Sequence, residues 1–81
     1  MKIEVHPRFY KSLKKIDKKE IVSILKAIKK LSISFGGLNI KKLVNFKPKY
    51  RLRVGNYRIL FEMDLDMISV YDVKHRKDVY K

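Results

Sequence analysis

The sequence predicts an α+β domain with the element order β-α-α-β-β-β, in which a helical hairpin packs on one face of a mostly antiparallel four-stranded sheet. The clearest sign of the sheet is the Gly55-Asn56 pair, which lies between two runs of alternating apolar and polar residues and is typical of a two-residue β-hairpin turn. The helical hairpin is predicted by two stretches of helically spaced apolar residues that only Asp17-Lys-Lys-Glu20 separates. With 81 residues the chain is expected to form one domain, residues 1–81.

The N-terminal half is expected to hold one strand and two helices. Residues 2–5 alternate polar and apolar side chains and predict a short strand. A first helix is expected over residues 8–16. A longer one is expected over residues 18–33, and its start has the form of a capping box with Asp17 as the N-cap and Glu20 reaching back to it. The apolar residues at helical spacing are Phe9, Leu13 and Ile16 in the first helix, and Ile21, Ile24, Leu25, Ile28 and Leu31 in the second.

The C-terminal half is expected to form three consecutive antiparallel strands. Residues 50–54 and residues 57–63 are the two arms of the hairpin, and residues 67–73 follow as a third strand. The facing of that third strand stays open, because its apolar side chains occupy both parities. These apolar residues are Ile68 and Val70 on one parity, and Tyr71 and Val73 on the other. Residues 38–49 are undetermined and could form either a turn of helix or an irregular strap.

Three arginines share one face of the predicted hairpin. Counting outward from the two-residue turn pairs Arg53 with Arg58 and places Arg51 on the same face. The opposite face is apolar and consists of Tyr50, Leu52, Val54, Tyr57, Ile59 and Phe61. Like charges directly opposite on a sheet are destabilising, and two guanidinium groups about 5 Å apart repel by at most about 3 kcal/mol at an effective dielectric near 20. The arrangement favours an anionic ligand lying across the arginines. The alternative is a solvated sheet face in a generally basic protein.

Charge is one-sided along the chain. The 21 Lys and Arg residues against 8 Asp and Glu residues give a formal net charge of +13, and no acidic residue lies between Glu20 and Glu62. Such a distribution indicates a polyanionic partner, which is a nucleic acid, the ribosome or an acidic protein. The candidate RNA-binding lysines in this stretch are Lys41, Lys42, Lys47 and Lys49.

Several classes of protein are disfavoured by the composition. The sequence contains no cysteine, which excludes a disulfide framework and a thiolate metal site. No apolar run approaches the length of a membrane span, and no signal-peptide pattern opens the chain. We therefore expect a cytoplasmic protein that has no contact with a membrane.

Two motifs together resemble the RelE/ParE superfamily of toxins from type II toxin-antitoxin systems. They are the hairpin YRLRVGNYRILFE and the C-terminal VKHRKDVY, and the opening strand and the two helices match as well, so the resemblance covers essentially the whole chain. The resemblance implies the fold but leaves two functional branches open. RelE-like members are ribosome-dependent mRNA endonucleases, whereas ParE-like members poison DNA gyrase.

For the RelE-like branch, the resemblance implies cleavage without a metal or other cofactor. The ribose 2′-hydroxyl attacks the adjacent phosphate, which requires cations around the developing charge as well as a proton acceptor and a proton donor. Arg58 matches the family's arginine after the hairpin tyrosine and would clamp the phosphate through a forked pair of hydrogen bonds. Arg51 and Arg53 match two positions that are lysines in the best-known RelE enzyme. Arginine does not give up its proton in proteins, so the base must be another group.

The C-terminal motif supplies the remaining candidates that this resemblance implies. Tyr80 matches a tyrosine that stacks on a base or bonds the phosphate. Lys74 falls where the best-known enzyme has arginine, and His75 is similar to the terminal histidine of other members. Histidine changes its charge near neutral pH, so His75 is the candidate general base. The alternatives are a surface histidine at a strand end and a tyrosine that merely packs.

The sequence therefore favours a metal-independent endoribonuclease that acts as an mRNA interferase on the ribosome and inhibits translation. A gyrase inhibitor without a catalytic site and a non-catalytic RNA-binding protein remain as alternatives. The resemblance also implies a cognate antitoxin, and the basic surface predicts that it is acidic and lies across the helices. The other expected partners are the ribosome and mRNA, and the free toxin is expected to be a monomer.

Overall fold

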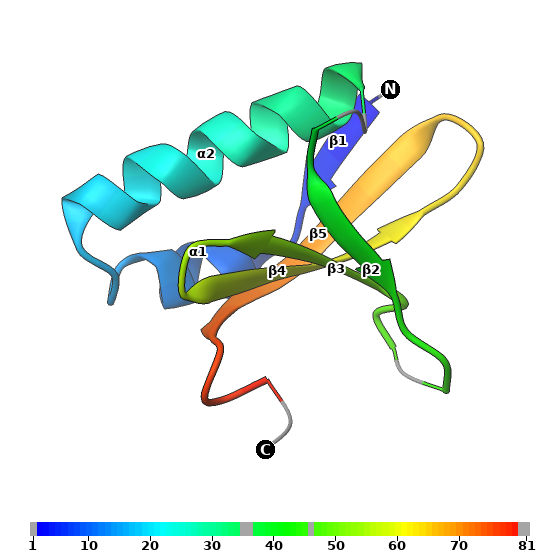
Figure 1. Ribbon diagram of the computed structural model, residues 1–81. Helices are drawn as coiled ribbons and strands as arrows, with labels where there is room; N and C mark the ends of the chain where they lie inside the picture. The colour runs from blue at the N-terminus through cyan, green and yellow to red at the C-terminus, as the bar shows by residue number, and fades with distance from the viewer. Residues whose placement is uncertain (1, 35–36, 46, 80–81) are drawn as a thin grey trace.

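Two helices pack on one face of a five-stranded mixed sheet, which confirms the predicted α+β class (Figure 1). The computed structural model describes residues 2–34, 37–45 and 47–79. Along the chain, the elements are β1 (Lys2–Val5), α1 (Pro7–Leu13), α2 (Lys18–Ile33), β2 (Asn39–Lys42), β3 (Tyr50–Val54), β4 (Tyr57–Met63) and β5 (Met67–His75). The strands lie in the order β1-β5-β4-β3-β2, with β1 parallel to β5 and the other neighbours antiparallel.

The expectation of four strands is wrong, because part of the undetermined stretch is a fifth strand. β2 pairs antiparallel with β3 through Asn39↔Arg53 and Lys42↔Tyr50 at its two ends. Only Ile40 of its four residues is half-buried, so the alternation that marks a strand is nearly absent from the sequence. Pairing with the already formed hairpin makes this segment a strand.

The helices follow the predicted pattern with two local differences. α2 has the predicted bounds, whereas α1 ends at Leu13 because the next residues form a tighter turn in which the Ile16 N–H donates to the Leu13 carbonyl. Asp17 is the N-cap of α2, but the capping box is not formed, since the Asp17 side chain makes no capping hydrogen bond. At the start of α1, His6 acts as the cap and its Nδ1 accepts from the Arg8 N–H at 3.2 Å.

A β-bulge between β4 and β5 explains why the facing of the last strand was ambiguous. Leu60 pairs with Asp72 but the next residue, Phe61, pairs with Val70, so Tyr71 is an extra residue in β5. The bulge shifts the parity of the strand, which lets Ile68, Val70 and Val73 all reach the core.

The core lies between the helices and the apolar face of the sheet. Its largest fully buried side chains are Phe9, Ile24, Leu31, Leu52, Ile59, Phe61, Ile68 and Val70. At its edge, the buried carboxylate of Asp72 accepts from the Ser12 hydroxyl at 2.6 Å and from the Val73 N–H at 2.8 Å. This pair of hydrogen bonds joins α1 to β5.

Candidate functional site

A row of cations crosses three strands on the sheet face opposite the core. The predicted hairpin register is confirmed: Arg53 is directly opposite Arg58, and Arg51 is directly opposite Leu60. β5 extends the row, because Lys74 is the partner of Arg58 on its other side. We call Arg53, Arg58 and Lys74 the cation row. Arg51 lies two residues from it on β3, facing Lys41 of β2.

Arg58 is held in a defined orientation by the hairpin turn. It is half-buried, and its Nη1 donates to the carbonyl oxygens of Gly55 at 3.1 Å and Tyr57 at 3.0 Å. Gly55 has a φ of +58°, a conformation that glycine adopts without the steric cost borne by other residues. The turn therefore positions a guanidinium group before any ligand arrives, and this lowers the ordering cost of binding an anion.

His75 lies at a register position on the other face of the sheet from the arginines. Its register partner is Tyr57, on the face opposite Arg58, and the two rings meet edge to face at a centroid distance of 5.4 Å. The physical reason is the alternation of a strand: Lys74 faces the cation row, and the residue after it faces away. The His75 Nδ1 also accepts from the Lys77 N–H at 3.2 Å. Tyr80 lies outside the described residues, so its expected role is untested.

The four candidate RNA-binding lysines divide between different surfaces. Lys41 is on the face of the cation row, opposite Arg51, whereas Lys42 is paired with Tyr50 and belongs to the other parity. Lys47 and Lys49 lie exposed in the connection from β2 to β3. The Lys49 N–H donates to the carboxylate of Glu62, which fastens that connection to β4.

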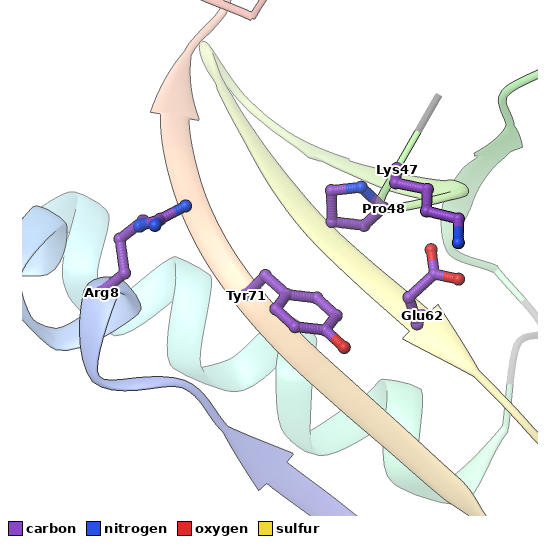
Figure 2. A pocket seen from close by; sticks show the side chains of 5 residues that line it. All are labelled: Arg8, Lys47, Pro48, Glu62 and Tyr71. Carbon is purple, nitrogen blue, oxygen red and sulfur yellow. The ribbon is translucent and has the colours of Figure 1, made fainter. Parts of the chain in front are cut away.

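A cavity on the open face of the sheet, which is the face opposite the core, was not predicted from the sequence. Its volume is about 390 Å³, and it is lined by Arg8, Lys47, Pro48, Glu62 and Tyr71 (Figure 2). These residues come from α1, the β2–β3 connection, β4 and β5, so no local sequence motif predicts the cavity. The one sequence feature that pointed to it was that the apolar residues of the last strand, Tyr71 among them, occupy both parities. The bulge accounts for this, because it leaves the Tyr71 ring out of the core.

Neither metal ligands nor a membrane span are found in the part of the chain that the structure describes. Within residues 2–34, 37–45 and 47–79, no group of three or more His, Cys, Asp or Glu side chains is placed to hold a metal ion. None of the helices in these same ranges is both long and apolar enough to cross a bilayer.

Comparison with known proteins gives a consistent family relationship. Residues 3–80 match the family described as the ParE toxin of type II toxin-antitoxin system, parDE. The toxin RelE3 of Methanocaldococcus jannaschii is 49% identical over 43 residues, which is 53% of this chain and 49% of that protein. The chain thus spans about half the length of this curated relative in the match.

Solved structures extend the relationship to the whole fold. The RelB-RelE antitoxin-toxin complex of Methanococcus jannaschii is similar with a TM-score of 0.80 and 35% identity, covering 95% of this chain and 94% of that chain. The archaeal RelE-RelB complex of Pyrococcus horikoshii OT3 has a TM-score of 0.76 at 20% identity, covering 96% and 97%. A copper-bound mutant toxin of Helicobacter pylori shares the fold, with a TM-score of 0.67 at 12% identity over 98% of both chains.

Proposed function

Because the chain belongs to the ParE toxin family of type II toxin-antitoxin systems, we propose that it is a toxin of the RelE type, an endonuclease that cleaves mRNA on the ribosome. The observation that carries the proposal is the cation row. Three cations at directly opposed positions on neighbouring strands repel one another, and an RNA phosphate bound across them would relieve that repulsion. Such a toxin acts in the cytoplasm and is monomeric when free of its antitoxin.

The proposed reaction is attack of a ribose 2′-oxygen on the adjacent phosphorus. The bond from phosphorus to the 5′-oxygen of the next nucleotide breaks, which leaves a 2′,3′-cyclic phosphate and a 5′-hydroxyl. Arg58, already oriented by the turn, clamps the phosphate, and Arg53 stabilises the charge that develops on its oxygens. Arg51 binds the neighbouring phosphate of the chain.

Two proton transfers complete this reaction. The candidate residues for these transfers are judged by whether they lie on the same face of the sheet as Arg58. The 2′-hydroxyl loses a proton and the leaving 5′-oxygen gains one. Lys74 lies in the cation row beside Arg58 and is able to take part in either transfer. His75 would have to act from the opposite face of the sheet, and Tyr80 is proposed from the resemblance alone.

Substitutions at Arg58 test the proposal. Arg58→Ala should abolish growth arrest and mRNA cleavage on induction, and Arg58→Lys should restore little activity because a lysine keeps the charge but not the fork. The measurement is primer extension on total mRNA, with far-UV circular dichroism to establish that each variant is folded. Lys29→Ala is the matched control, since this exposed lysine lies on α2 and not on the open face. Full cleavage by Arg58→Ala would refute the catalytic role of the cation row.

A gyrase inhibitor is the second candidate, because the matching family is described by its ParE toxin. In that case the open face would bind protein, and no mRNA fragments would appear after induction. A supercoiling assay with purified gyrase separates the candidates: the RelE-type proposal predicts no inhibition, and inhibition without mRNA cleavage would replace it by the alternative.

An acidic antitoxin is the proposed partner, in line with the RelB-RelE complexes among the similar structures. The outer face of α2 offers apolar anchors among lysines: Val22 is 52% exposed and Leu25 is 47% exposed. Leu25→Asp should weaken co-purification with the antitoxin by removing an anchor and repelling acidic side chains. Leu65→Asp is the control, since Leu65 is 100% exposed in the β4–β5 turn. Equal effects of both changes would argue against docking on α2.

A further inference from the structure

We propose that the cavity beside Tyr71 is a nucleobase subsite that prefers a base with an exocyclic amino group over uracil. This inference rests on the proposed function, in that the bound nucleotide belongs to the RNA being cleaved. At about 390 Å³ the cavity falls within the size range of small-molecule sites. Its lining combines one aromatic ring, one carboxylate and two cations, which are the groups that recognise a base and its phosphate.

Tyr71 provides the stacking platform. As the extra residue of the β5 bulge, it is turned away from the core and its ring is half-buried at the cavity. Figure 2 shows this ring at the centre, with Arg8 on one side and Pro48 and Glu62 on the other. The imidazole of His6 supports it at a centroid distance of 5.9 Å and an interplanar angle of 38°. Unpaired bases stack on such rings whatever their sequence, so Tyr71 supplies affinity and not selectivity.

Glu62 provides the selectivity. Its Oε2 accepts the Lys49 N–H, and this hydrogen bond fixes the carboxylate at the cavity wall. Its Oε1 then accepts from an amino group of cytosine, adenine or guanine, as carboxylates do with the cytosine N4. Uracil has carbonyl oxygens in place of those amino groups, and they would be repelled. The cations Arg8 and Lys47 at the rim balance the phosphate that accompanies the base.

The cavity and the cation row lie on the same face of the sheet. Glu62 is four positions beyond Arg58 on β4, so the two share a parity and their backbones are about 13 Å apart at about 3.3 Å per residue. Leu60 lies between them on that face, opposite Arg51. A short single-stranded segment can therefore place one phosphate on the cation row while a neighbouring base occupies the cavity.

The first test is binding of mononucleotides to the purified chain, followed by NMR at the Tyr71 ring. We expect cytidine 5′-monophosphate to bind roughly tenfold more tightly than uridine 5′-monophosphate. Glu62→Gln should remove this difference, since glutamine keeps an oxygen for the Lys49 N–H but presents a donor where the carboxylate accepted. Tyr71→Leu should weaken both nucleotides by roughly tenfold, and Tyr71→Phe should bind like the wild type. Tyr10→Leu is the matched control, because Tyr10 is 54% exposed on α1 and does not line the cavity.

The second test compares cleavage sites on ribosome-bound mRNA between the wild type and Glu62→Gln. The variant should lose discrimination against uracil at one position near the cut. Equal binding of the two mononucleotides to the wild type, or a preference that survives in Glu62→Gln, would overturn the subsite whether or not mRNA is cleaved. A Glu62-dependent preference in a protein that cleaves no mRNA would refute the proposed function and leave the subsite standing.

Discussion

Removing Arg53 should stabilise the fold while it impairs the toxin. Arg53 is exposed and sits directly opposite Arg58 on the neighbouring strand, a placement in which like charges are destabilising. Two unit charges about 5 Å apart repel by about 0.8 kcal/mol in bulk water and about 3 kcal/mol at an effective dielectric near 20. Exposure and free rotamers favour the lower figure, so Arg53→Gln should gain about 0.5–1 kcal/mol. For a domain of this size that raises the melting temperature by about 2–8 °C.

The assay is thermal unfolding at two ionic strengths. At about 0.01 M salt the Debye length is about 30 Å and the gain should be complete, whereas at about 1 M salt it is about 3 Å and the gain should disappear. Arg76→Gln is the control, because Arg76 is exposed in the turn after β5 and contributes the same unit to the net charge of +13 without facing another cation across a strand pair. The difference between the two variants isolates the local repulsion from the relief of overall charge.

Local repulsion between Arg53 and Arg58 is refuted if Arg53→Gln is no more stable than Arg76→Gln at low salt, or if the gain in stability persists at high salt. Either result would mean that the cation row is not strained, and the case for an anionic ligand there would lose its physical basis. The same variant should also cleave mRNA more slowly than the wild type. A gain in stability together with a loss of activity is what a site arranged for a ligand predicts.

Three further predictions concern the buried hydrogen bond at Asp72, the residues that transfer protons, and the salt dependence of ribosome binding. Ser12→Ala should lower the free energy of unfolding by about 1–3 kcal/mol in urea, because it deprives the buried Asp72 carboxylate of a donor, while Ser23→Ala on the exposed face of α2 should change little; equal losses would contradict the role of the buried bond. His75→Gln should leave the single-turnover cleavage rate nearly unchanged and Lys74→Met should lower it by roughly a hundredfold, and the reverse order would return the base to the other face of the sheet. The logarithm of the ribosome affinity should fall with the logarithm of the salt concentration with a slope of about −2 to −3 from the cation row alone, and a flat dependence would point to apolar docking.

The sequence by itself determined those features whose physics is local. The hairpin register follows from a two-residue turn and an alternating pattern, and the structure has the predicted pairs from Val54↔Tyr57 to Tyr50↔Phe61. α2 has its predicted bounds, because its helically spaced apolar residues extend over several turns. The residues directly before and after the helix interrupt that apolar pattern. The opposed arginines were likewise visible in the hairpin, and the family resemblance was visible in the hairpin together with the C-terminal motif.

Tertiary structure decided everything that depends on which strand lies next to which. β2 became a strand only because β3 offered it a free edge, and the bulge in β5 turned Tyr71 out of the core and His75 away from the arginines. One inserted residue reverses the facing of all that follows it in a strand, and no composition reveals where the insertion lies. Lys74 belongs to the cation row, and Arg8 and Glu62 line the cavity, because the fold brings together segments that are far apart in the chain. Such sites are properties of strand pairing and packing, because the side chains that form them have no local reason to meet.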